Sequence, residues 1–182
     1  MQSAACRDRM LWVEEEPPLS SDRPFDRSRS HTIGRVSEVT IATPIREGLV
    51  PGELRSYAKR VRDILEGFQR RIDEGTPTPP TLLGTIHFAR WFVLEGRDPA
   101  GTLVFTSNFD GDLKIYLRDF TAKIPQDIDE IWGNCVGYPE LGCRDFERFW
   151  RYTTAHRIET LAFVPAHPDL TVEDIDLFRP RT

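Results

Sequence analysis

The feature that most constrains the fold is a pair of apolar segments joined by a short polar loop. Residues 85–94 (TIHFARWFVL) and 102–109 (TLVFTSNF) are rich in aromatic and β-branched side chains, which favour strands. The loop between them, EGRDPAG, contains the Gly and Pro that are typical of turns. The pattern predicts an antiparallel hairpin whose first strand begins near residue 82 and whose second strand ends at Phe109.

Other elements follow from periodicity. In residues 51–75, apolar side chains recur at the i, i+3, i+4, i+7 spacing of an amphipathic helix, which ends at Gly75 in front of TPTPP. The segment VSEVTIATPI predicts an earlier strand over residues 36–45. After the hairpin, helices are predicted over residues 113–124, then to Trp132, and over 146–156. A last strand in ETLAFVP and a short closing helix capped by Thr171 complete the pattern.

The order of elements is strand, helix, strand, strand, helix, strand, with an extra helix before the last strand. This order predicts an α+β fold, a ferredoxin-like βαββαβ sandwich with a four-stranded antiparallel sheet, over residues 36–182. Residues 1–35 mix charge with Pro and Ser, which predicts an extended or disordered arm. Because both main helices pack on one face of such a sheet, the opposite apolar face predicts a homodimer.

Composition excludes several classes of function. The net charge of -5 argues against nucleic acid as a partner, because binding a polyanion needs a basic surface. No apolar run approaches the length of about 18 residues that a membrane span requires, and no secretory signal is present, so a cytoplasmic protein is expected. The three cysteines form no metal-binding or redox pattern, and free thiols are expected. No recognised metal site is predicted.

The first hairpin strand carries most of the candidate site. Strict alternation places His87 and Trp91 on one face and Arg90 on the other. Both faces are largely apolar, which predicts a central strand covered twice. If the helices cover the face of Phe88, His87 and Trp91 face an open cavity with Asn108; if the faces are reversed, Arg90 does. His87 fits a metal or haem ligand, a general base, or a histidine satisfied within the sheet.

The charged groups of the hairpin allow two interpretations. A buried Arg90 needs an anionic partner, either Asp110 or Asp112 as a structural pair or a bound ligand. Asp110 or Asp112 is also placed to cap the helix that begins near residue 113. His156 stands at the end of a helix, where a cation is favoured by the helix dipole.

In element order, residues 36–165 resemble the dimeric α+β barrel superfamily, and FDGD at 109–112 is similar to part of the GxxDG signature of dye-decolorising peroxidases. The resemblance implies a small dimeric enzyme of oxidative chemistry, monooxygenase-like or haem-associated, acting on an apolar small molecule. His87 and Asn108 are the expected catalytic residues, and Trp91, Arg90, Asp110 and His156 the expected ligand-binding residues. His156 matches the place of the haem ligand in the relatives. The alternative is a non-catalytic module that holds a lipid, a haem or a protein partner.

Overall fold

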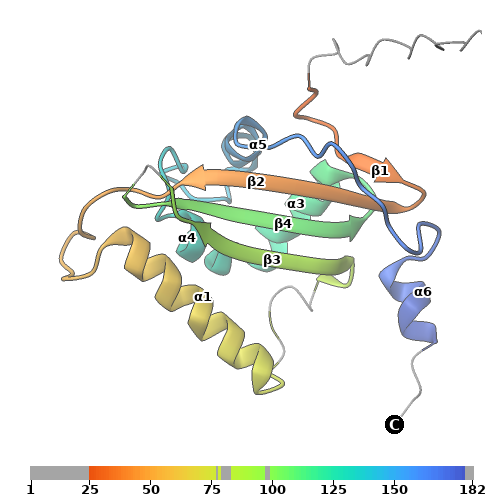
Figure 1. Ribbon diagram of the computed structural model, residues 1–182, viewed down its shortest axis with the longest axis horizontal. Helices are drawn as coiled ribbons and strands as arrows, with labels where there is room; N and C mark the ends of the chain where they lie inside the picture. The colour runs from red at the N-terminus through yellow and green to blue at the C-terminus, as the bar shows by residue number, and fades with distance from the viewer. Residues whose placement is uncertain (1–24, 77, 79–82, 97–98, 179–182) are drawn as a thin grey trace, which may run out of the picture.

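The computed structural model describes residues 25–76, 78, 83–96 and 99–178. Its elements are β1 (His31–Ile33), β2 (Val36–Pro44), α1 (Tyr57–Asp73), β3 (Ile86–Leu94), β4 (Thr102–Asp110), α3 (Leu113–Lys123), α4 (Pro125–Trp132), α5 (Phe146–Ala155) and α6 (Val172–Leu177). The four strands form one antiparallel sheet in the order β1-β2-β4-β3. Figure 1 shows α3, α4 and α5 behind the sheet and the chain after α5 passing in front of the strands toward α6. The fold is therefore α+β, as predicted.

The hairpin and its helices follow the local sequence closely. β3 and β4 pair in register from Phe88 with Asn108 to Leu94 with Thr102. Asp112 accepts the backbone N–H groups of Lys114 and Ile115 and so caps α3. Thr171 caps α6 in a reciprocal capping box with Asp174. These predictions are confirmed because each depends on residues close together in the chain.

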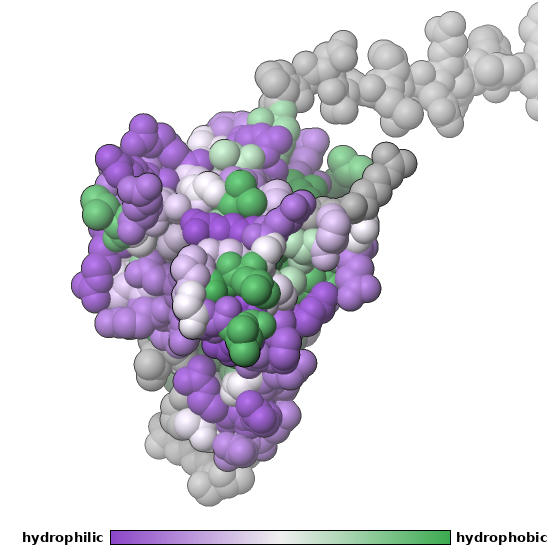
Figure 2. All heavy atoms as spheres, turned by 90° about the vertical axis from the view of Figure 1, so that its left-hand side faces the viewer, coloured by the Kyte–Doolittle hydropathy of each residue, from purple (hydrophilic) through white to green (hydrophobic). Residues whose placement is uncertain are grey.

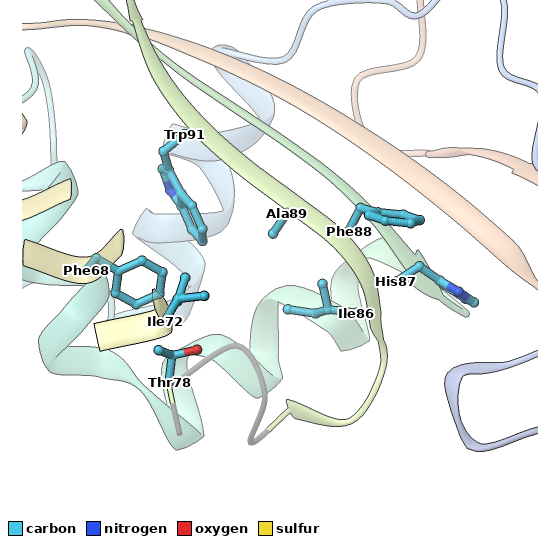
Figure 3. A pocket seen from close by; sticks show the side chains of 8 residues that line it. All are labelled: Phe68, Ile72, Thr78, Ile86, His87, Phe88, Ala89 and Trp91. Carbon is cyan, nitrogen blue, oxygen red and sulfur yellow. The ribbon is translucent and has the colours of Figure 1, made fainter. Parts of the chain in front are cut away.

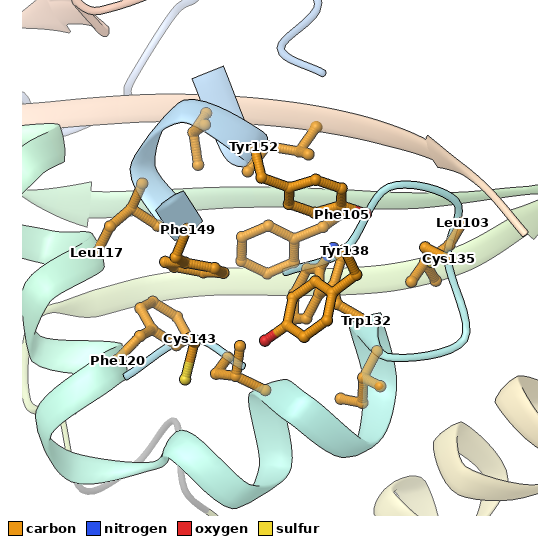
Figure 4. Close-up of a cluster of buried hydrophobic side chains, with 14 of the residues drawn as sticks. Leu103, Phe105, Leu117, Phe120, Trp132, Cys135, Tyr138, Cys143, Phe149 and Tyr152 are labelled. Atoms are coloured by element: carbon orange, nitrogen blue, oxygen red, sulfur yellow. The ribbon is translucent and has the colours of Figure 1, made fainter. Parts of the chain in front are cut away.

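The core lies between the sheet and α3, α4 and α5. Phe105 and Phe109 on β4 are fully buried, and their rings contact aromatic side chains of the helices. Figure 4 shows this cluster, in which Phe149 and Tyr152 of α5 face Phe120 and Trp132. We call this side the inner face of the sheet. Burying large aromatic rings in this layer supplies much of the stability of the fold.

The predicted strand at residues 159–165 is not formed, so the ferredoxin-like order is not confirmed. β1 pairs with Val36–Glu38 and occupies that part of the free edge of β2. Beside it, Ile41 and Arg157 form an isolated bridge, in which the Ala42 N–H donates to the His156 carbonyl and the Ile158 N–H donates to the Thr40 carbonyl. The edge of β2 is therefore shared by β1 and the residues that follow α5. The C-terminal segment, residues 158–170, then crosses the sheet instead of extending it.

Residues 25–35 of the predicted arm are bound to the body, and residues 1–24 lie outside the described part of the chain. The buried Arg157 guanidinium donates to the carbonyls of Arg27 and Arg29, at 2.8 and 2.6 Å. Gly34, at φ 60°, forms the turn between β1 and β2 against Pro168. A Cβ on residue 34 would lie 2.4 Å from the Pro168 carbonyl oxygen, so only glycine allows this approach.

Within the described residues, no helix is long and apolar enough to cross a membrane.

Candidate functional site

The face of the sheet opposite α3, α4 and α5, here called the outer face, is only partly covered. β3 lies at an edge of the sheet, so the prediction of a central strand covered on both faces is wrong. On its outer face Phe88, Phe92 and Leu94 are 68%, 46% and 58% exposed. Figure 2 views the end of the molecule where β2 finishes and shows small apolar groups within a mostly hydrophilic surface. These three exposed apolar side chains of β3 form a candidate contact surface.

The side-chain alternation of β3 is broken by a bulge. Ile86 pairs with Phe109 and Phe88 with Asn108, so His87 is the extra residue between them. Beyond the bulge, Trp91 points to the inner face, where its ring centroid lies 4.8 Å from that of Phe105. The expectation that Trp91 lines the open side of the sheet is wrong. The alternative arrangement is observed, with Arg90 on the outer face.

An outer-face pocket of about 300 Å³ lies between the sheet and the C-terminal segment. Phe92 of β3 and Phe163 of the C-terminal segment supply aromatic walls. The polar lining comes from all three long strands and from the C-terminal segment, and consists of Glu38, Thr40, Arg90, Thr106, Ser107, Asn108 and Thr160. The pocket therefore combines an apolar body with several polar groups, as small-molecule sites commonly do.

The pocket offers more unused donors than acceptors. Neither the Arg90 guanidinium nor the Asn108 carboxamide makes a side-chain hydrogen bond or ion pair within the described residues. Glu38, by contrast, is 4% exposed and accepts a 2.6 Å hydrogen bond from the Thr160 hydroxyl. That bond also anchors the C-terminal segment over β2. Arg90 is exposed, and the predicted pairing with Asp110 or Asp112 is not observed.

His87 and Asp110 form a separate pair at the end of the hairpin. The Nε2 atom of His87 lies 2.7 Å from Oδ1 of Asp110, and their side chains are 11% and 14% exposed. The second carboxylate oxygen of Asp110 accepts the backbone N–H of Val172 at 2.9 Å, at the start of α6. Asp110 thus fixes the imidazole and the C-terminal helix together. A carboxylate that holds one ring nitrogen of a histidine orients the other nitrogen for proton transfer.

His87 also borders a cavity of about 230 Å³ between α1 and β3. Phe68, Ile72 and Trp91 line its apolar part, and Figure 3 shows their side chains gathered on one side of β3. In the same view the His87 ring is turned away from them. The histidine and the apolar lining therefore do not converge on a common point.

His156 lies apart from these groups. It follows the last residue of α5, and its Nδ1 atom is 2.8 Å from the Tyr152 carbonyl oxygen. Its ring packs at 4.6 Å from the Tyr152 ring and lines neither the outer-face pocket nor the cavity beside α1. Because Nε2 of His87 is held by Asp110 and His156 lines neither cavity, neither of these two histidines is placed as a haem ligand.

The two thiols of the described residues are structural. Cys135 and Cys143 are free and fully buried, and burial raises the pKa of Cys135 to about 11 and that of Cys143 to about 12. A buried neutral thiol is a poor nucleophile. Within the described residues, no group of three or more His, Cys, Asp or Glu side chains is placed to hold a metal ion.

Sequence reasoning missed Glu38, Thr160 and Phe163 as pocket residues. Glu38 carried a usable signal, since it is the one charged residue inside the apolar segment VSEVTIATPI. Thr160 and Phe163 were assigned to a strand, and their position over the outer face depends on the crossing of the C-terminal segment.

Comparisons of the chain with protein-family models, with curated proteins and with solved structures found no match.

Proposed function

We propose that the protein is a binding module that holds an apolar small molecule in the outer-face pocket. The observation that carries this proposal is the convergence of two aromatic walls and several polar side chains from β2, β3, β4 and the C-terminal segment on one cavity. Holding a ligand between a rigid sheet and a crossing segment needs no catalytic group. The ferredoxin-like resemblance is compatible with this use of the open sheet face, but adds no residue to it.

A titration with the neutral dye Nile red tests the proposal, because its fluorescence rises when it enters an apolar site. Thr106→Trp should fill the pocket and abolish the rise. Thr102→Trp is the matched control, because Thr102 points to the same face of β4 but does not line the pocket. Equal dye binding by both variants and by the wild-type protein would refute the proposed site.

A catalytic role is a second candidate, supported by the His87–Asp110 pair. A histidine held by a carboxylate at 2.7 Å is a suitable general base. Asn108 lies on the same face of β4, two residues before Asp110. Oxidative chemistry and haem remain predictions that these contacts do not support. His87→Gln would abolish turnover of a substrate if the pair were catalytic, while leaving binding in the outer-face pocket intact.

We further propose a homodimer formed through the outer face of β3. Phe88 and Leu94 are exposed there, outside the lining of the pocket, and a second copy would bury both. Light scattering should give twice the chain mass of 21.0 kDa at micromolar concentration. Phe88→Ser with Leu94→Ser should give a monomer. A monomeric wild-type protein would contradict the dimer and leave the pocket unaffected.

A further inference from the structure

We propose that the ligand of the outer-face pocket carries a carboxylate, which Arg90 binds. This inference rests on the proposed function, since it specifies the chemistry of the molecule that the same pocket takes. Its starting point is the lining itself. Arg90 and Asn108 contribute donors that no described residue uses, and they line one cavity with two aromatic rings.

The strand register places these donors close together. Arg90 on β3 is directly opposite Thr106 on β4, and Thr106 is opposite Thr40 on β2. Asn108 lies one step along the same face, opposite Glu38. Arg90 and Asn108 are therefore diagonal neighbours, about 7 to 8 Å apart, and the long side chain of Arg90 can reach a small group that Asn108 also contacts. Two hydroxyls, from Thr40 and Thr106, complete a wall that is rich in donors.

Arg90 differs from the arginines that stabilise the surface. Arg35, Arg55 and Arg62 each form an ion pair with a carboxylate of this chain, at 2.6 to 3.3 Å. The carboxylates nearest to Arg90 have other hydrogen-bond partners. Glu38 accepts a hydrogen bond from the Thr160 hydroxyl, and Asp110 binds His87 and the Val172 N–H. No carboxylate of the described residues forms an ion pair with Arg90. Arg90 is distinguished by its place in the lining of the pocket, beside Asn108 and two aromatic rings.

The polar donors and the aromatic side chains of the lining together indicate the class of ligand. A guanidinium presents paired donors that match the two oxygens of a carboxylate. Phe92 and Phe163 require a flat apolar body beside that group. A volume of about 300 Å³ suits a molecule of one or two fused rings. The structure thus assigns the pocket to a small aromatic or alicyclic carboxylate.

A matched pair of probes tests this inference. 1-Naphthoate and the neutral 1-naphthalenemethanol have the same ring system, and calorimetry gives their dissociation constants for the wild-type protein. We expect naphthoate to bind about tenfold more tightly, because a charged hydrogen bond contributes about 1.5 kcal/mol. Arg90→Gln should remove this preference, so that the two probes bind with equal affinity. Arg151→Gln, which removes the same charge from an exposed position on α5, should keep the preference.

The outcomes separate this inference from the proposed function. Equal affinities of the wild-type protein for the two probes would overturn the inference and leave the binding site standing. A preference that persists in Arg90→Gln would also overturn it, because another group would then select the anion. No binding of either probe would contradict the proposed function, and the inference would fail with it.

Discussion

The two faces of the sheet are built from the same strands but are covered in different ways. On the inner face Phe105 is 1% exposed, whereas on the outer face Phe92, from the neighbouring strand, is 46% exposed. Helices α3, α4 and α5 cover the inner face, with α1 packed beside them. Over the outer face, the described residues place the C-terminal segment, which is anchored by the Thr160–Glu38 bond. The aromatic content of a strand therefore does not by itself mark the core. The covering elements decide which rings stabilise the fold and which remain available to a ligand.

The largest expected effect tests this difference directly. Phe105→Ala should lower the free energy of unfolding by about 3 to 5 kcal/mol, because it leaves a cavity among Trp91, Phe120 and Trp132. Phe92→Ala should cost less than about 1 kcal/mol, because its ring is already half in water. Urea denaturation of both variants measures the two losses. Similar losses would remove the distinction between the faces.

The C-terminal covering depends on Asp110. Asp110→Ala removes its bonds to His87 and to the Val172 N–H, so we expect a loss of about 1 to 3 kcal/mol. Cleavage within residues 158–178 by a protease should become faster. Asp119→Ala is the control, since Asp119 forms only a surface pair with Lys123 at 3.5 Å. If proteolysis is unchanged in Asp110→Ala, Asp110 does not hold this segment in place.

Alkaline pH should lower the free energy of unfolding by ionising Cys135, which is buried in the core. The folded-state pKa of this thiol, about 11, is above its ordinary value of 9.0, so the fold favours the neutral form. Its stabilisation is complete below pH 9 and is lost as pH rises toward 11, by at most about 1.4 kcal/mol per pH unit. The stability difference between the wild-type protein and Cys135→Ala should therefore shrink between pH 8 and pH 10. A constant difference would mean that the thiol is not desolvated.

The smallest effect is expected at Arg90. Because Arg90 is exposed and has no partner among the described residues, Arg90→Met should change the free energy of unfolding by less than about 0.5 kcal/mol. This reverses the expectation from the sequence, in which Arg90 was paired with Asp110 and its loss was costly. Thermal denaturation decides between them. A large drop in melting temperature would restore a structural role for Arg90.

Local patterns predicted most of the elements, and contacts between distant residues account for what was missed. The hairpin, α1 and the caps at Asp112 and Thr171 depend on neighbours in the chain, and each was predictable. The absence of the last strand was not, because β1, formed by residues of the predicted arm, supplies the fourth strand of the sheet instead.

The candidate site was less predictable for the same reason. The bulge at His87 broke the alternation on which the assignment of faces rested, although one of the two arrangements left open was correct. The partner of Asp110 could not be chosen from sequence, because His87 and Arg90 both lie on the adjacent strand. Glu38, Thr160 and Phe163 came together only through the crossing of the C-terminal segment.

NMR can show directly whether the outer-face pocket is the binding site. In a titration of the isotope-labelled protein with 1-naphthalenemethanol, amide shifts should change at Thr40, Thr106, Asn108 and Thr160, which line the outer-face pocket. The amide shifts of Phe68 and Ile72, beside the cavity between α1 and β3, should not change. Changes confined to that cavity, with none on the outer face, would contradict the central claim.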